Sequence, residues 1–433
     1  MKKALSFISA LALLATATAC GGTKDSSNQG TDAGTSNTES KKDDGGKSGG
    51  KQTINLWSFT DEVPSMVDKY KELHPEFADK YDVKVTIVPT TDGAYQPALD
   101  KALTGGGADV PDMYCAEAAF VLKYTQGEMS SYAAPYKDLG IDVDNEIKAA
   151  DIAQYTVDIG SNNGNVVGLG YQATGGAFIY RRSVAKAAFG SDDPKVVEEK
   201  IGAGSNSWDK FLEAAKELKA KNYAILSGDG DLWHAVENSS DKGWIVDDKL
   251  HLDPKREIFM DLSKTMKDEG YINCTTDWTD SWFADMRSEG EKGVLGFFWG
   301  GTWVLANKDT TKKDIVAKII TWITLDSSET GLQYFWANGT LNGEGGTKDT
   351  VASGTVMAKS DGKLDFLNNQ NMFEAFVPAN KYANGKNLTQ YDETINTYWR
   401  DQVRQYTAGA KTREQAIADF KTQVKENLDV VVE

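Results

Sequence analysis

The alternation of short apolar strands with amphipathic helices constrains the fold from Thr53 onward more than any other feature. Residues 54–59 form a short apolar run, and the segment after them carries apolar side chains at helical spacing. "DVKVTIVP" predicts a second strand, 95–103 predicts a helix, and "DMYCAEAAF" predicts a third strand followed by a helix start. Strands that alternate with helices at this interval indicate an α/β fold with a largely parallel sheet.

Acidic side chains lie where the first and third of these strands end. Asp61 and Glu62 follow the first strand, and Glu117 follows the third. Because ligands bind at the carboxyl ends of strands in open α/β sheets, we expect all three residues to contact a ligand. The alternative is structural: Asp61 and Glu62 would begin a helix, and Glu117 would be a solvated residue at another helix start.

The N-terminus has the pattern of an export signal. Lys2 and Lys3 precede an apolar run, 4–15, that is too short to span a bilayer as a mature helix. The run leads into "ATAC", which resembles the lipobox of bacterial lipoproteins, where the signal is cut before a cysteine that then carries diacylglycerol. This resemblance implies a signal peptide at 1–19 and lipidation of Cys20. The alternative is an ordinary secretory signal with a chance cysteine.

Residues 20–52 have the composition of a disordered tether. They are almost all Gly, Ser, Thr, Asn, Asp and Lys, so they cannot bury enough apolar surface to offset their ordering entropy. The root-mean-square reach of such a tether is roughly 30 Å. We therefore expect the lipid on Cys20 to hold the folded part of the protein at the extracytoplasmic face of the cell membrane.

Charge and metal-ligand spacing exclude several partners. The formal charge is −17; the signal contributes +2 and the tether is neutral, which leaves about −19 on the body. Nucleic acid is a poor partner for such a surface. None of the three histidines is spaced as a metal ligand, and we expect no metal or cofactor.

Cys115 and Cys274 either pair or, as we expect, stay as two separate buried thiols.

Several segments, in order along the chain, resemble one protein family. The strand ending in Trp57, the Asp61 loop and the Gly-rich turn with "PD" are similar to the start of bacterial extracellular solute-binding proteins of the carbohydrate class. "YQATGGAFIYRRSVAKAAFG" resembles the family's first crossing between lobes. "DWTDSWFADMRSEGEKGVLGFF" resembles the helix and strand before the return crossing, and "TREQAIADFKTQVKENL" resembles a late helix.

The resemblance implies a two-lobed α/β fold of the periplasmic-binding-protein type (type II), with a hinged cleft that closes over a sugar. One lobe would comprise 53–174 and 303–350, and the other 175–299 and 351–433. It further implies a monomer without catalytic residues that delivers its ligand to the permease subunits of an ABC transporter.

A sugar site needs flat aromatic surfaces and polar groups that pair with hydroxyls, and the resemblance places more candidates in the cleft. Gln172 and Thr174 precede the first crossing and would face the cleft. The others are Asp229, Asp231 and Trp233 in "SGDGDLWH", and Tyr391 and Asp392 in "TQYDETIN". The alternative for "SGDGDLWH" is a plain Asp/Gly turn with the tryptophan packed under it.

The stretch "GVLGFFWGGTWVLANK" directly joins two strands that relatives separate by a segment carrying an aromatic ligand contact. We expect Trp299 to replace that aromatic residue and Trp303 to pack in the crossing strand. We expect Trp278 and Trp282, at i and i+4, to form one core face of a helix rather than a sugar platform.

Three functions are compatible with these patterns. The first, which we favour, is a binding protein that captures a carbohydrate, in our expectation an oligosaccharide, and delivers it to an ABC permease. The second is a surface glycosidase, which needs two carboxyls roughly 5–10 Å apart across the scissile bond. The third is a tethered scaffold that has lost its ligand with the shortened segment. Within the first class, an acid-rich cleft could prefer a polyamine or another cation.

Overall fold

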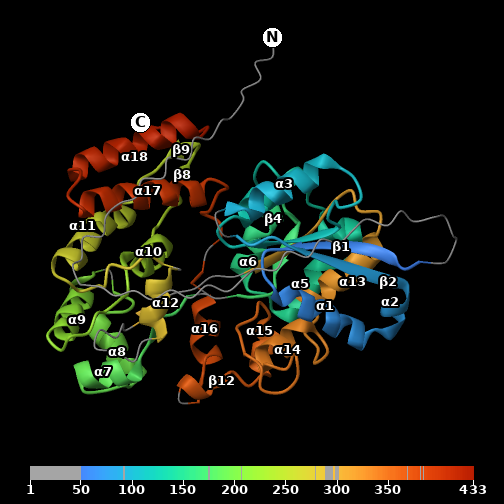
Figure 1. The fold of residues 1–433 in the computed structure, drawn as a ribbon, viewed down its shortest axis with the longest axis horizontal. Helices are drawn as coiled ribbons and strands as arrows, with labels where there is room; N and C mark the ends of the chain where they lie inside the picture. The colour runs from blue at the N-terminus through green and yellow to red at the C-terminus, as the bar shows by residue number, and fades with distance from the viewer. Residues whose placement is uncertain are drawn as a thin grey trace, which may run out of the picture. The chain divides into compact units, whose positions relative to one another are not determined.

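Most of the chain from Gly50 onward is described in the computed structural model (Figure 1). The described residues are 50–90, 93–173, 176–205, 207–277, 279–287, 296–297, 302–367, 369–380, 382–383 and 385–433. Within them, no helix is long and apolar enough to cross a membrane. The expected signal peptide, Cys20 and the expected tether up to residue 49 lie outside the described residues, whereas Gln52, which we expect at the end of the tether, begins β1.

A five-stranded sheet combines distant parts of the chain in the order β2-β1-β3-β11-β6. β1 (Gln52–Ser58) pairs in parallel with β2 (Tyr81–Ile87) and β3 (Met113–Glu117). β11 (Thr302–Ala306) runs antiparallel to both β3 and β6 (Gly168–Gly170). All strands except β11 therefore point the same way, and their carboxyl ends meet at one edge. This confirms the predicted α/β class with its largely parallel sheet.

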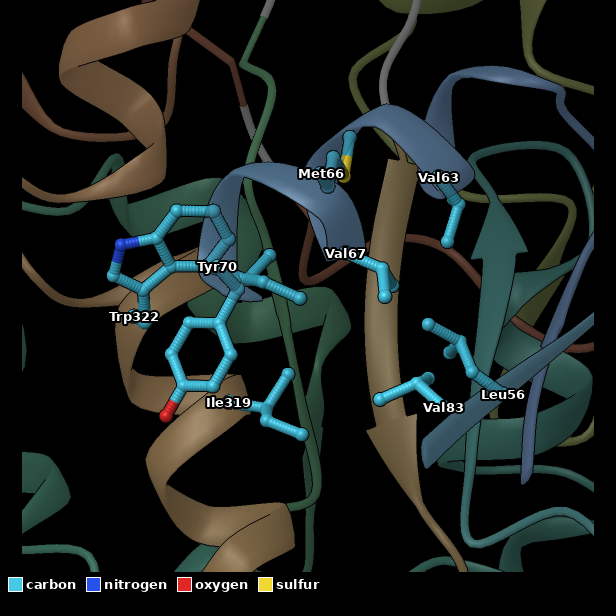
Figure 2. Close-up of a pocket in the computed structure, with 9 residues that line it drawn as sticks. Leu56, Val63, Met66, Val67, Tyr70, Val83, Ile319 and Trp322 are labelled. Atoms are coloured by element: carbon cyan, nitrogen blue, oxygen red, sulfur yellow. The ribbon is translucent and has the colours of Figure 1, made fainter. Parts of the chain in front are cut away.

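The helix after β1 shows how the apolar pattern produces this packing. α1 (Glu62–Leu73) buries four residues at helical spacing, Val63, Met66, Val67 and Tyr70. Together with α13 (Lys313–Thr324) they enclose a small apolar gap over β1 and β2, shown in Figure 2. Its remaining lining residues are Leu56, Val83, Ile319, Trp322 and Ile323. Since the lining surface is apolar, we assign this gap to the core and not to a ligand site.

A second hydrophobic core lies in a mainly helical part of the chain. Its centre holds fully buried aromatic rings, with Trp399 5.0 Å from Phe420 and 6.1 Å from Trp244 between ring centroids. The surrounding helices are α7 (Arg182–Phe189), α8 (Pro194–Ile201), α9 (Asp209–Lys219), α10 (Asp229–Asn238), α11 (Pro254–Asp268), α17 (Asp392–Thr407) and α18 (Arg413–Asn427).

A third, smaller cluster departs from the expected division. α14 (Leu332–Asn338), α15 (Gly354–Ala358) and α16 (Phe373–Asn380) pack around Val356 and Met357. We expect the region after residue 350 in the second lobe, whereas the apolar residues of α15 and α16 pack with α14 and not with the second core. The lobe boundaries themselves remain a prediction.

The other elements are short. They are α2 (Pro75–Lys80), α3 (Tyr95–Gly105), α4 (Val121–Thr125), η2 (Ser130–Tyr132), η3 (Tyr136–Leu139), α5 (Val143–Ala150), α6 (Gln154–Ile159), β4 (Ser161–Asn162), β5 (Asn165–Val166), β7 (Ile179–Tyr180), β8 (Ile245–Val246), β9 (Lys249–Leu250), α12 (Asp280–Arg287), β10 (Gly296–Phe297), β12 (Lys363–Leu364), η4 (Asp365–Leu367) and β13 (Gln370–Asn371).

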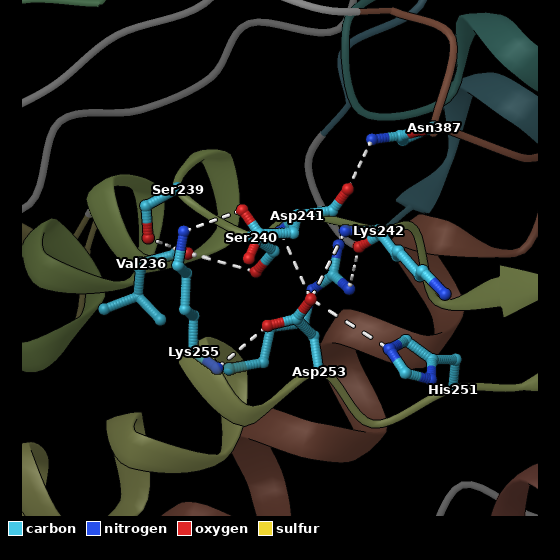
Figure 3. Close-up of polar contacts among 10 residues, drawn as sticks. Val236, Ser239, Ser240, Asp241, Lys242, His251, Asp253, Lys255 and Asn387 are labelled. Carbon is cyan, nitrogen blue, oxygen red and sulfur yellow. Dashed lines mark hydrogen bonds and ion pairs between the residues drawn. The ribbon is translucent and has the colours of Figure 1, made fainter. Parts of the chain in front are cut away.

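Residues 385–390, which we call the linking segment, contact residues on both sides of the expected lobe division. Asn387 Nδ2 donates to the Asp241 carbonyl at 3.3 Å, beside the Asp253 carboxylate that receives the Asp241 and Lys242 backbone N–H groups (Figure 3). On the other side, Gln390 Oε1 accepts from the Glu128 backbone N–H at 2.9 Å. The linking segment therefore ties the regions of the two cores together.

The C-terminal residues add a strand-like edge to the β8–β9 hairpin. The Leu250 N–H donates to the Val431 carbonyl at 2.8 Å, and the Val431 N–H donates to the Asp248 carbonyl at 3.0 Å. Asp248 has a φ of 62° in the tight turn of the hairpin. The end of the chain thus pairs with backbone groups that the hairpin would otherwise leave at its edge.

Within the described residues, no disulfide joins the two cysteines of the body. Cys115 lies buried in β3 as expected, but Cys274 is exposed. The expectation that both thiols would be buried is wrong for Cys274, which sits in a connection with a φ of 60° rather than in an element of the core.

Candidate functional site

Polar and aromatic side chains gather where β1 and β6 end, at the same edge of the sheet. Glu62 begins α1 directly after the β1 loop, and the Tyr171 hydroxyl donates to its Oε1 at 2.7 Å. Gln172, the next residue after Tyr171, donates through Nε2 to Asp349 Oδ2 at 3.0 Å. The sheet edge therefore brings two predicted residues, Glu62 and Gln172, into one cluster, as the strand directions require.

Trp336 completes this cluster. Its indole Nε1 donates to Asp349 Oδ2 at 3.3 Å, and its ring meets the Tyr171 ring edge-on, with centroids 5.9 Å apart. Trp336 is half-buried, whereas Tyr171 is 2% exposed. We call Glu62, Tyr171, Gln172, Trp336 and Asp349 the strand-end cluster. It combines an indole, an amide and two carboxylates, which are the groups that recognise sugar rings and hydroxyls.

The strand-end cluster carries uncompensated negative charge. Burial raises the pKa of Glu62, the Tyr171 hydrogen bond opposes this, and the charges of Asp349 and Asp61 raise it further. Burial also raises the pKa of Asp349. Across the described part of the chain, neither Glu62 nor Asp349 forms an ion pair with a lysine or arginine. Asp61 is exposed beside Glu62, and its side chain does not cap α1.

Glu117 ends β3 at the same edge of the sheet and faces α17. Its Oε2 accepts from the Ala119 N–H at 3.0 Å, while burial and then the charge of Glu393 raise its pKa to about 7. Glu393, in the first turn of α17, accepts from Gln96 Nε2 at 3.3 Å. A carboxyl with a pKa near 7 can either donate or accept a hydrogen bond at neutral pH, which suits a ligand hydroxyl.

Asp229 and Asp231 lie in the first turn of α10, and both have partners within their own region. Asp231 is 4% exposed; its Oδ1 accepts from Trp282 Nε1 at 3.0 Å and its Oδ2 from the Gly228 N–H at 3.4 Å. Burial raises the pKa of Asp231 to about 6. Asp229 Oδ2 accepts from the Ser263 hydroxyl. Acids at this end of a helix stabilise it, and the ligand roles of both residues remain predictions.

Trp233 corrects one expectation. The residue is 1% exposed, and its ring is stacked 6.3 Å from Trp244 and lies 5.0 Å from Phe259. Neither face is open to a sugar, because neighbouring rings of the second core cover it. The alternative for "SGDGDLWH" holds only in part: the tryptophan is packed in the core, but the segment begins helix α10 and is not a plain Asp/Gly turn.

Asp392 is also placed inside the protein. It is 6% exposed, and its Oδ1 accepts from both the backbone N–H and the hydroxyl of Thr389 at 2.8 Å. This bond pattern fixes the chain at the start of α17, so the carboxylate has a structural role, and its ligand contact remains a prediction. Tyr391, directly before it, is half-buried, and its ligand role remains a prediction.

Of the tryptophans near the crossing strands, those that the structure describes lie in the core, as expected. Trp303 is 1% exposed in β11 and donates from Nε1 to the Thr156 carbonyl at 2.9 Å, which confirms its core role. Trp282 is 5% exposed, also as expected for a core face. Trp278, Trp299 and Thr174 lie outside the described residues.

Sequence reasoning missed Tyr171, Trp336, Asp349 and Glu393. Tyr171 could have been found, since it adjoins Gln172 in the "YQATGG" segment that had already been singled out. Asp349 lies 177 residues beyond Gln172 and has no motif around it. No local sequence pattern predicts a contact between two residues so far apart in the chain.

Comparisons with known proteins agree with this fold. A lactose-binding protein of Rhizobium radiobacter is 26% identical over 208 residues, which are 46% of this chain and 44% of that protein, so the match spans less than half of the relative. A crystal structure of an extracellular solute-binding protein of family 1 covers 87% of this chain and 99% of its own, with a TM-score of 0.65 and 17% identity. The galacto-N-biose/lacto-N-biose I-binding protein of an ABC transporter from Bifidobacterium longum, solved with lacto-N-biose, covers 90% and 100%, with a TM-score of 0.62 and 15% identity.

These structural likenesses establish the two-lobed α/β fold of periplasmic solute-binding proteins. The sequence profile of the bacterial extracellular solute-binding proteins matches residues 60–330, more than half of the chain and most of both cores. The chain therefore belongs to the family of bacterial extracellular solute-binding proteins.

Proposed function

We propose that this protein captures a sugar, an oligosaccharide in our expectation, outside the cytoplasm and delivers it to the permease subunits of an ABC transporter. The strand-end cluster carries the proposal, because it offers one aromatic surface and several hydrogen-bonding groups at the ligand edge of the sheet. The sugars bound by relatives with the same fold support it.

The proposed mechanism is closure without covalent chemistry. Sugar bound to the strand-end cluster and Glu117 would gain further contacts from the second lobe, and Glu393 of α17 already faces Glu117. A ligand that makes extra contacts in one conformation shifts the population towards it. We further propose a monomer that diacylglycerol on Cys20 anchors to the membrane. The closed form would be the one recognised by the permease.

A calorimetric titration of the purified chain against a panel of mono- and oligosaccharides tests sugar binding. We expect at least one saturable sugar, and we expect Trp336→Ala to weaken it tenfold or more, since a stacked ring is lost. Tyr382→Ala is the matched control, because Tyr382 is 88% exposed and lies outside the strand-end cluster. A panel without any saturable sugar would refute the proposal. If the Trp336→Ala and Tyr382→Ala variants bind the sugar with equal affinity, Trp336 is not part of the binding site.

A further inference from the structure

Two carboxylates of the candidate site, Glu62 and Asp349, have no lysine or arginine partner among the described residues. In the second lobe, Arg400 donates to both oxygens of Asp277 at 2.7 and 2.9 Å, so this charged pair is neutral. At the sheet edge, by contrast, Glu62 and Asp349 act on one another as like charges. The hydrogen-bond donors to these two carboxylates are uncharged: Tyr171 donates to Glu62, and Gln172, Trp336 and Thr350 donate to Asp349.

The same excess of negative charge extends along the edge to Glu117. Glu393 is the charged group that acts on Glu117, and it is also an acid. Lys123 acts on Glu393 but is itself bound to Asp100 at 2.6 Å. A neutral sugar would displace water from these carboxylates without supplying a positive charge to balance them. An ammonium group would supply that positive charge.

The indole of Trp336 points to the same ligand chemistry. It is half-buried, held edge-on to Tyr171, and fixed by its bond to the Asp349 carboxylate. Aromatic faces attract cations electrostatically, and tryptophan does so most strongly of the aromatic residues. An aromatic ring bonded to one carboxylate, with a second carboxylate in the same cluster, therefore suits a ligand that has both a ring face and a positive charge.

We infer that the ligand of the strand-end cluster is a sugar that carries a protonated amine, which Glu62 and Asp349 bind. This inference rests on the proposed sugar-binding function and narrows it to one class of sugar. The amine would lie between the two carboxylates, and the sugar ring would lie against Trp336.

Three disaccharides with the same β-1,4 linkage test the inference: the glucosamine disaccharide, its N-acetylated form, and cellobiose. Calorimetric titration of the whole chain at pH 6.5 and low salt should show the glucosamine disaccharide binding at least tenfold tighter than cellobiose, about 1.4 kcal/mol. Glu62→Gln and Asp349→Asn should each remove most of that preference, because each should weaken binding of the glucosamine disaccharide more than binding of cellobiose. Asp138→Asn, an exposed acid elsewhere, should leave the preference intact.

Two results would overturn the inference. If cellobiose or the N-acetylated disaccharide binds as tightly as the glucosamine disaccharide, the charge preference is wrong while sugar binding stands. If the preference survives in both Glu62→Gln and Asp349→Asn, the amine lies elsewhere. Binding of none of the three, when another neutral sugar of the larger panel binds, likewise refutes the amine preference and leaves the proposed function intact. Should one variant fail to fold, which circular dichroism would show, the other still decides.

Discussion

The buried carboxylate of Asp392 should make the stability of the protein depend on pH in a measurable way. Burial is the main cause that raises its pKa from 3.8 to about 6, while two bonds from Thr389 and the charge of Arg256 oppose it. Because the pKa is higher in the folded state, the stability contributed by this group is fully present below pH 3.8. It is lost as pH rises through about 6.

Proton linkage gives the size of the effect. Between pH 4.5 and 7.5 the wild-type chain should lose about 2 kcal/mol of unfolding free energy relative to Asp392→Asn, whose amide does not titrate. The amide oxygen can still accept the Thr389 bonds, so the start of α17 should persist. Taking the difference between the two chains cancels the titration of every other group.

Urea unfolding followed by tryptophan fluorescence at four pH values between 4.5 and 7.5 measures this difference. Asp401→Asn is the control, since Asp401 is exposed on the same helix, and its difference from wild type should stay within about 0.5 kcal/mol across the range. A difference between wild type and Asp392→Asn that does not change with pH would refute the reasoning. It would mean that the carboxylate is solvated and not enclosed.

Two further predictions concern other sites. NMR titration of the Glu117 carboxyl should give a pKa of about 7, and Glu393→Gln should lower it; a pKa below 5 in the wild type would contradict the burial of Glu117. Gly243→Ala should lower the unfolding free energy by about 1–3 kcal/mol, because the new Cβ would lie 1.9 Å from the Asn387 carbonyl oxygen. Gly105→Ala, with open space around the new Cβ, should leave the unfolding free energy unchanged. If both alanine variants lose the same unfolding free energy, the linking segment can move aside without cost.

The sequence was sufficient for the elements that depend on local pattern. The first strand, expected at 54–59, is β1 at Gln52–Ser58, and the helix expected at 95–103 is α3 at Tyr95–Gly105. Their apolar spacing repeats with the period of the element, so it specifies both the element and its buried face. Placing Glu62 at the ligand edge of the sheet likewise needed only the strand directions, whereas Gln172 was expected there from the family resemblance.

Contacts between distant segments could not be predicted in this way. Trp233 lies in the second turn of α10, and the residue type is the same whether its ring enters a cleft or the core. The orientation of α10 decides between the two, and it directs the ring towards Trp244. Trp336 and Asp349 meet Tyr171 and Gln172 only after the sheet and α14 have assembled. Pairings of that kind depend on tertiary packing, which no short stretch of sequence records.

The pairing of Val431 with the β8–β9 hairpin has a practical consequence for anyone who expresses this protein. Removing the last four residues would expose the free backbone groups of Asp248 and Leu250, and an exposed strand edge of this kind recruits other chains. A shortened chain should therefore be more prone to aggregate than the full chain. Purification tags that must leave the protein monodisperse are better placed where they do not compete with Val431 for the hairpin.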